Sequence, residues 1–204
     1  MMKYIKNVLV LTIITVIAGF LLGYVYDITK EPIEKANENI LSTALNMVFP
    51  ESKQFDVYDD VNGAQAILAE AGYDQIELIN VFIAKDDSGS PLGYVLSIDT
   101  NEGYGGDITV LLGIKNDGAI NGLEILSINE TPGLGMNANT DKFKSQFKGK
   151  NVAKISYTKT GAKEDYEIDA LSGATITTNA MTNAVNAGLE IFSKINTNGG
   201  EVNE

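Results

Sequence analysis

Hydrophobic residues form one long run near the N-terminus, and further along the chain they recur at helical or strand spacing. The run from Ile5 to Tyr26 is almost entirely apolar, and no charge interrupts it after Lys6 in its first turn. A membrane-spanning helix needs about 20 apolar residues, whereas a cleaved secretory signal has a run of about 7–15 that ends at a small-residue site. No clear site of that kind follows the run. The pattern therefore predicts a retained transmembrane anchor within residues 1–29.

Beyond the anchor, apolar residues keep a helical rhythm. Pro32 sits where a helix could start, and the rhythm continues toward Pro50. We therefore expect a stalk helix over residues 30–50 and a globular domain over residues 51–195. Further helices are expected at residues 61–71, 140–147 and 176–195, and the polar residues 196–204 predict a flexible tail.

Strand patterns dominate the middle of the globular domain. Asn116-Asp117-Gly118 is a strong hairpin cue between two apolar segments, and Thr160-Gly161 lies between a later pair. The sum predicts a single N-terminal transmembrane helix followed by an α+β domain with mostly antiparallel strands. The expected strand pairs are residues 75–84 with 92–99, 108–115 with 120–128, and 152–159 with 164–168.

The composition restricts the chemistry that this chain can perform. It contains no cysteine and no histidine, which excludes disulfides, iron–sulfur ligation by this chain, thiolate zinc sites, histidine-ligated haem and His-based catalytic triads. The net charge of -12 argues against nucleic-acid binding, which needs a basic surface. Lys3 and Lys6 lie at the N-terminal end of the anchor, and positive flanks favour the cytoplasm. We therefore expect a cytoplasmic N-terminus and a domain on the outer side of the cell membrane.

The segment Asp169-Ala-Leu-Ser172-Gly173-Ala174-Thr175 combines hydroxyl groups with small neighbours. Gly173 and Ala174 leave room for a large group to approach a hydroxyl. Thr175 should lie at or just before a helix N-terminus, where unpaired N–H groups and the helix dipole stabilise an anion. Alternatively, Ser172 or Thr175 caps the helix, because Ser and Thr are preferred N-caps. The segment alone leaves both interpretations open.

Two glycine-containing loops could accompany this segment. In Glu130-Thr131-Pro132-Gly133-Leu134-Gly135, Leu134 could contact a planar ring and Thr131 its polar edge, while Gly135 leaves the backbone bare. The alternative is a type II turn that ends a hairpin. In Gly103-Tyr104-Gly105-Gly106, Tyr104 could stack on such a ring or be an ordinary surface or packing aromatic.

These three loops, in this order behind one anchor, resemble the G subunit of the Rnf complex, a membrane-bound, ion-translocating ferredoxin:NAD oxidoreductase. The resemblance spans nearly the whole chain, including Val48-Phe49-Pro50 at the end of the stalk. The C subunit of the sodium-pumping NADH:quinone reductase shares the attachment segment and the Thr-Pro-Gly-Leu-Gly motif, although its chains are usually longer. Both families imply an electron-carrying flavoprotein.

The resemblance implies FMN bound covalently, through its phosphate, to Thr175. It also implies that a flavin transferase reads Asp169, and that the partners are the other membrane and redox subunits of the complex. No catalytic residue and no metal site is expected, since the flavin supplies the chemistry. A separate exported flavoprotein, or a membrane-tethered binding module without flavin, would fit the same anchor. The remaining cofactor-binding candidates are Ser172, Gly173, Ala174, Thr131, Gly133, Leu134, Gly135 and Tyr104.

Overall fold

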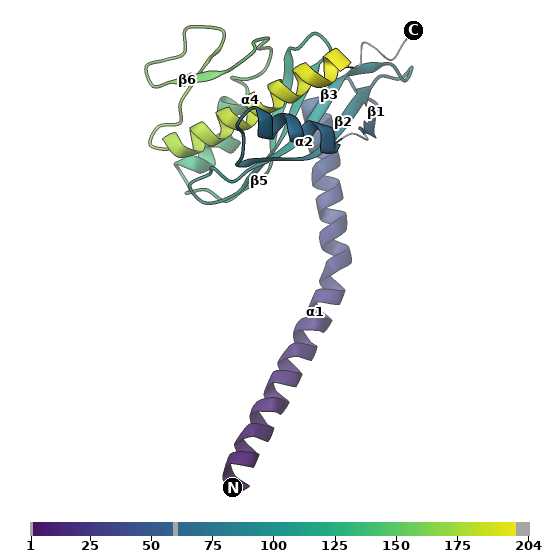
Figure 1. Ribbon diagram of the computed structural model, residues 1–204, viewed down its shortest axis with the longest axis vertical. Coiled ribbons are helices and arrows are strands. Elements are labelled where there is room, and N and C mark those ends of the chain that lie inside the picture. The colour runs from purple at the N-terminus through teal and green to yellow at the C-terminus, as the bar shows by residue number, and fades with distance from the viewer. Residues whose placement is uncertain (1, 59–60, 199–204) are drawn as a thin grey trace. The chain divides into compact units, whose positions relative to one another are not determined.

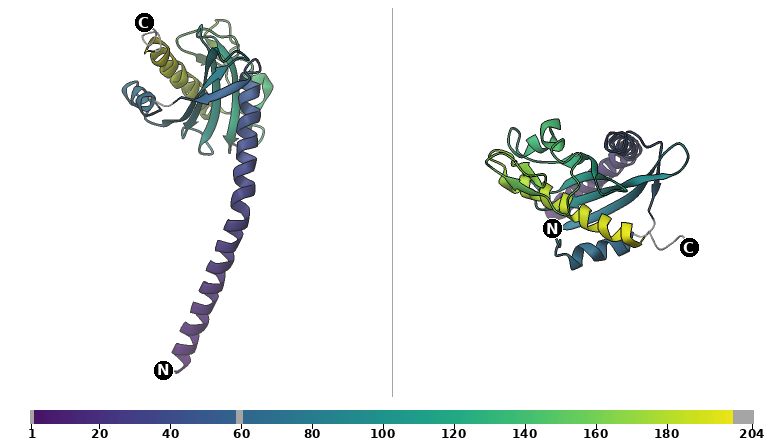
Figure 2. Two further views of the ribbon diagram at one scale, coloured as in Figure 1. Left: turned by 90° about the vertical axis from the view of Figure 1, so that its right-hand side faces the viewer. Right: turned by 90° about the horizontal axis from the view of Figure 1, so that it is seen from above.

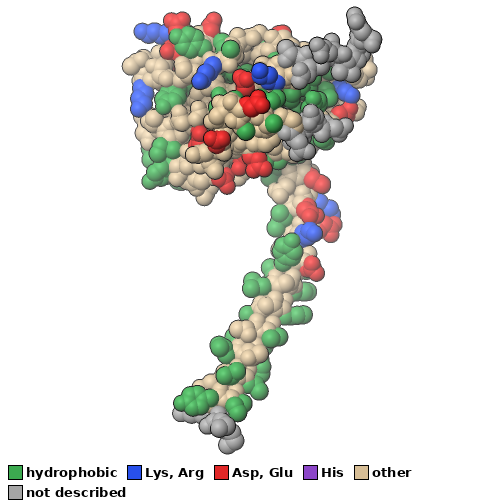
Figure 3. Space-filling model, in the orientation of Figure 1, with side chains coloured by type: hydrophobic (Ala, Val, Ile, Leu, Met, Phe, Trp, Pro, Cys, Tyr) green, Lys and Arg blue, Asp and Glu red, His purple; other side chains and the backbone are tan. Residues whose placement is uncertain are grey.

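The computed structural model describes residues 2–58 and 61–198 of the chain (Figure 1). Internal contacts divide the chain into two compact units, Met1–Ser42 and Thr43–Glu204. Helix α1, Met2–Val48, forms the first unit and enters the second. Among the described residues, its stretch Tyr4–Val48 is the one helix long and apolar enough to cross a membrane. Figure 3 shows hydrophobic side chains exposed along this helix.

Helix α1 does not restart at Pro32, the position where the sequence suggested a new stalk helix. Pro32 lies inside one continuous helix. A proline removes one backbone hydrogen bond from a helix interior, but its neighbours favour the helix through pairs of opposite charge four residues apart. Lys35 Nζ lies 2.6 Å from Glu31 Oε1, and Lys30 Nζ lies 4.0 Å from Glu34 Oε1. The division into an anchor of residues 1–29 and a stalk of residues 30–50 stays a prediction.

The second unit contains a five-stranded antiparallel sheet in which each strand pairs with the next along the chain. The first two expected hairpins are confirmed, with turns that contain Gly89 and Gly118 in positive φ. The strands are β1 Gln54–Val57, β2 Ile76–Lys85, β3 Pro91–Thr100, β4 Ile108–Lys115 and β5 Ile120–Ile128.

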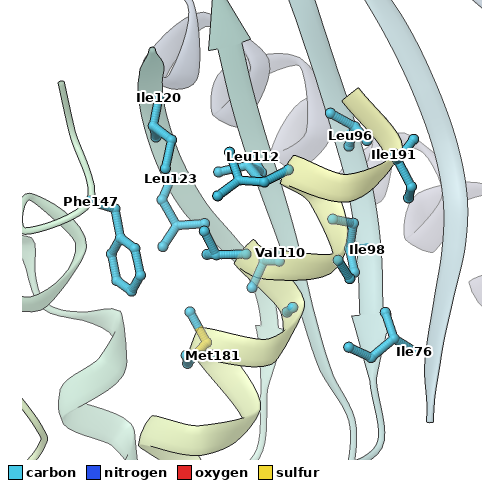
Figure 4. Close-up of a cluster of buried hydrophobic side chains, with 14 of the residues drawn as sticks. Ile76, Leu96, Ile98, Val110, Leu112, Ile120, Leu123, Phe147, Met181 and Ile191 are labelled. Atoms are coloured by element: carbon cyan, nitrogen blue, oxygen red, sulfur yellow. The ribbon is translucent and has the colours of Figure 1, made fainter. Parts of the chain in front are cut away.

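The C-terminal helix α4, Thr175–Asn198, packs on one face of this sheet and buries the main core (Figures 1 and 2). Met181 and Ile191 of α4 lie among aliphatic side chains of the strands, as Figure 4 shows. Helix α2, Val61–Glu70, lies at the same face. The short helices η1, Gly135–Asn139, and α3, Asp141–Lys144, follow β5.

The end of α1 and the residue after it cover the opposite face of the sheet. Successive side chains of a strand point to opposite faces, so Gly113 faces away from α4, whereas Leu112 belongs to the main core. A Cβ added at Gly113 would lie 2.3 Å from Val48 Cγ1. Val48 and Phe49 are fully buried, and Asn121 Nδ2 donates to Val48 O at 2.8 Å. These two stalk residues therefore belong to the packed domain.

The third expected hairpin is wrong. Strands β6, Ser156–Thr158, and β7, Glu167–Asp169, pair in parallel and form a separate two-stranded sheet. Parallel pairing requires the chain between them to reverse direction twice, and within this loop the N–H of Ala162 donates to Asp169 Oδ1 at 2.6 Å. The cue at Thr160-Gly161 marks a bend inside this loop rather than a hairpin.

The ends of two predicted helices also differ from expectation. The helix expected at residues 140–147 is α-helical only over Asp141–Lys144 and continues as turns. Helix α4 extends through Asn198, so residues 196–198 of the expected tail are helical, and residues 199–204 lie outside the described residues. Helix ends depend on packing, which periodicity does not record.

Candidate functional site

The three loops identified from the sequence converge on one cavity of about 520 Å³. This volume falls within the range of about 300–1,000 Å³ that is usual for small-molecule sites. Seven of the ten predicted site residues line it, whereas Gly133 and Ser172 lie in the turns beside it and Asp169 lies further back. Its lining residues are Tyr104, Glu130, Thr131, Leu134, Gly135, Gly173, Ala174, Thr175, Ile176 and Thr177.

The attachment segment forms a tight turn that leads directly into α4. The N–H of Ala174 donates to Leu171 O at 3.1 Å, and Gly173 has a φ of 72°. A positive φ at the third position is what a type II turn requires, and glycine adopts it without steric cost. Thr175 is the first residue of α4, and its side chain is exposed. The predicted position at a helix N-terminus is therefore confirmed.

A different threonine makes the capping contacts at this turn. Thr178 Oγ1 accepts the N–H of Leu171 at 3.0 Å and donates to Ala174 O at 2.9 Å. Within the described part of the chain, neither Ser172 Oγ nor Thr175 Oγ1 makes a hydrogen bond. The interpretation in which Ser172 or Thr175 caps α4 is therefore wrong. The Thr175 hydroxyl remains available beside the first N–H groups of the helix, which an α-helix leaves without intrahelical partners.

The loop after β5 is a type II turn, which was the alternative interpretation of its sequence. The same loop also lines the cavity, as the first interpretation expected. The N–H of Leu134 donates to Thr131 O at 3.1 Å, and Gly133 has a φ of 76°. Leu134 is partly exposed, and its Cδ2 would lie 3.1 Å from a Cβ at Gly173. The turn therefore packs against the attachment segment.

Neighbouring side chains of the protein leave no room for a side chain at Gly135. A Cβ at this position would lie 2.4 Å from Glu130 Oε2 and 2.6 Å from Thr177 Oγ1. We expected the bare backbone at Gly135 to admit a planar ligand. In the structure these two side chains occupy the space above the glycine, so the missing Cβ accommodates a carboxylate and a hydroxyl in the cavity wall.

Glu130 is a pocket residue that the sequence analysis quoted in its motif but did not select. Its side chain is buried, with 7% of its surface exposed, and its Oε1 accepts the N–H of Tyr104 at 2.8 Å. A Cβ at Gly105 would lie 1.9 Å from Asn129 O, so the glycine loop packs closely on the residues after β5. Tyr104 is held at the rim, where the residue is 70% exposed.

Two further lining residues, Ile176 and Thr177, were also missed. They follow Thr175 in the first turn of α4, and Ile176 is exposed at the cavity whereas Thr177 is buried. Helical spacing would not have indicated them, because residues one and two positions after Thr175 point to other sides of the helix.

Asp169 does not line the cavity. It is exposed at the end of β7, its Oδ1 accepts the N–H of Ala162, and its own N–H donates to Gln146 Oε1 at 2.6 Å. The side chain thus orders the loop between β6 and β7, beside the attachment turn. Its expected role in transferase recognition stays a prediction.

Comparisons with known proteins agree with this site. Residues 103–190, which contain all three loops, match the family of FMN-binding domains. The chain is 32% identical over 190 residues to the G subunit of the Na⁺-translocating ferredoxin:NAD⁺ oxidoreductase complex of Acetobacterium woodii, covering 92% of this chain and 90% of that one. It is 30% identical over 180 residues to the G subunit of the proton-translocating complex of Clostridium ljungdahlii, covering 88% and 86%.

A solved structure shows the same fold. The C subunit of the Na⁺-translocating NADH-quinone reductase of Parabacteroides distasonis superimposes with a TM-score of 0.53 at 24% identity, over 72% of this chain and 78% of that one. The likeness concerns the fold of the domain.

Proposed function

Because this chain belongs to the family of G subunits of ion-translocating ferredoxin:NAD oxidoreductase complexes and contains an FMN-binding domain, we propose that it carries FMN joined through its phosphate to Thr175. The proposal depends most on one observation: the Thr175 hydroxyl is exposed at a helix N-terminus, on the edge of a cavity of suitable size, and makes no hydrogen bond with the described residues.

The residues around the cavity fit the two chemically different parts of FMN. The first N–H groups of α4 and the positive end of its dipole would stabilise the phosphodiester, by about 0.3–1 kcal/mol for an exposed charge. The first turn of α4 contains no acidic residue to oppose this. Tyr104, Leu134 and Ile176 are exposed at the cavity and offer apolar surface to the isoalloxazine ring. The bound flavin would supply electron transfer, while the chain binds and orients it.

Helix α1 would anchor this domain in the cell membrane beside the other membrane and redox subunits. The lysines at the N-terminal end of the anchor favour a cytoplasmic N-terminus, so the flavin domain would lie on the extracytoplasmic side. Covalent attachment suits such a location, because a dissociated FMN would diffuse away from an exported carrier. A flavin transferase would add the FMN during maturation and would recognise Asp169 and the turn after it.

The alternatives have less support. The comparison with a C-type subunit rests on fold alone, whereas the G subunits match over most of their length. A separate exported flavoprotein would have the same attachment site, and genes for the other subunits of the complex beside this one would argue against it. A flavin-free binding module loses its main basis, because the hydroxyl of Thr175 has no capping role.

The test is an intact mass of the chain produced together with a flavin transferase. The parent should gain the mass of FMN less water and retain yellow, fluorescent flavin after denaturation. Thr175→Ala should lose both signals. Thr160→Ala is the matched control, because Thr160 is another exposed threonine of the same domain and does not line the cavity. A parent chain with the bare polypeptide mass under these conditions would refute the proposal.

A further inference from the structure

Glu130 places a buried carboxylate in the wall of the proposed flavin pocket. More than nine-tenths of its surface is removed from solvent. In the described part of the chain, no lysine lies within ion-pair distance of it. Burying a carboxylate without a neighbouring cation destabilises a folded protein. Such a group therefore calls for a functional explanation.

The two oxygens of this carboxylate have different surroundings. Oε1 accepts the N–H of Tyr104 and fixes the glycine loop at the rim. Oε2 lies above Gly135, close to the hydroxyl of Thr177, and makes no hydrogen bond with any described residue. Since every fully enclosed side-chain oxygen or nitrogen of the described residues has a partner, Oε2 must reach the open space of the cavity.

We propose that Glu130 is the electrostatic partner of the flavin, with Oε1 holding the Tyr104 loop and Oε2 facing the bound ring or its ribityl chain, and that its charge lowers the flavin's midpoint potential. This inference rests on the proposed function, since it needs FMN in this cavity. The ring N–H and the ribityl hydroxyls of FMN are hydrogen-bond donors, and Oε2 can accept a hydrogen bond from either.

The direction of the effect follows from charge. An electron added to the flavin increases the negative charge of the pocket, and a carboxylate in the wall of the same pocket opposes that increase. The opposition is stronger in a pocket wall than in water, because the effective dielectric constant is lower there. Reduction is therefore harder with Glu130 ionised than with a neutral residue in its place.

Glu130→Gln separates the charge from the structural contact. Glutamine has nearly the same shape, and its amide oxygen can still accept the N–H of Tyr104. Glu102→Gln is the matched control, because Glu102 precedes the same glycine loop, bonds to Asn183 Nδ2 at 2.7 Å, and does not line the cavity. Glu102 is only partly buried, so solvent screens its charge.

The experiment is a potentiometric titration of the full chain in detergent, restricted to protein whose intact mass shows bound FMN. Glu130→Gln should shift the flavin midpoint potential to a higher value than in the parent, and by more than Glu102→Gln does. An unchanged potential, or a shift no larger than in the control, would overturn the inference. If the parent itself carries no FMN, the proposed function fails instead.

A second variant keeps the test decisive if the Gln variant folds poorly. Glu130→Asp keeps the charge but shortens the side chain, so it should retain a low potential while loosening the Tyr104 loop. If the Asp variant shows the same rise in potential that is expected for Gln, the effect is structural and the electrostatic role is refuted.

Discussion

At the residue scale, the site is built from positions whose roles are set by neighbours rather than by residue type. Thr175 and Thr178 are both threonines in the first turn of α4. Thr178 is buried and its hydroxyl makes two hydrogen bonds, whereas Thr175 is exposed and its hydroxyl bonds to none of the residues that the structure describes. Gly135 is equally dependent on its surroundings, since Glu130 and Thr177 fill the space that a side chain would need. The chemistry available at each position is therefore a consequence of packing.

Thr178→Val should destabilise the domain by about 1–3 kcal/mol, because it leaves the N–H of Leu171 without its acceptor. It should also slow flavin attachment, since the turn that presents Thr175 loses its link to α4. Urea unfolding and the rate of mass gain with the transferase measure the two effects. The control is Thr182→Val, because within the described ranges the buried Thr182 hydroxyl makes a single hydrogen bond, to Thr178 O at 2.8 Å. Equal losses in both variants would contradict the argument.

At the element scale, α4 serves as a common support for the main sheet and for the small parallel sheet. Its apolar face packs on the strands. Its buried Asn186 accepts the N–H of Ile155 at 2.7 Å and donates to Ile155 O at 2.9 Å, which fixes the segment just before β6. Among the described residues, no neighbouring strand pairs with the backbone N–H and C=O of Ile155. The Asn186 side chain supplies both hydrogen bonds instead.

Asn186→Ala should leave both backbone groups of Ile155 unpaired in a buried place, at a cost of about 1–3 kcal/mol for each. The segment before β6 should then open more often, which hydrogen exchange at the Ile155 amide would report as faster exchange. Asn183→Ala is the control, because its amide contacts Glu102 and leaves Ile155 alone. Identical Ile155 exchange in the two variants would exclude the supporting role.

At the scale of the whole molecule, the boundary between the two compact units falls within α1 rather than at its end. The contact division falls at Ser42, and the helix residues after it include the fully buried Val48. Together with Phe49, it covers the sheet face opposite α4. A domain defined from residue 51 would thus lack part of its own core.

Two truncated chains test this boundary. A chain that starts at Thr43 should fold and stay soluble without detergent, because the exposed apolar run is removed. A chain that starts at Ser52 should be less stable by about 3–6 kcal/mol, since each large buried side chain contributes about 1.5–3 kcal/mol and both Val48 and Phe49 are lost. Urea midpoints of the two chains decide the matter, and equal midpoints would contradict the boundary at Ser42.

The sequence by itself determined the features that depend on local preference. The apolar run predicted the long apolar helix, the glycine turns predicted the antiparallel hairpins of the main sheet, and three short motifs predicted the loops of the site and the family. These succeed because apolar periodicity and glycine backbone freedom act over a few neighbouring residues.

Only the tertiary structure decided which residues contact one another and which are buried together. It paired β6 with β7 in parallel, carried α1 through Pro32, placed Val48 in the core, and buried Glu130 against the cavity. Each of these outcomes depends on contacts between residues that are far apart in the chain or on the summed stability of a whole helix. Burial and charge environment are properties of assembled elements, so a pattern of neighbouring residues does not contain them.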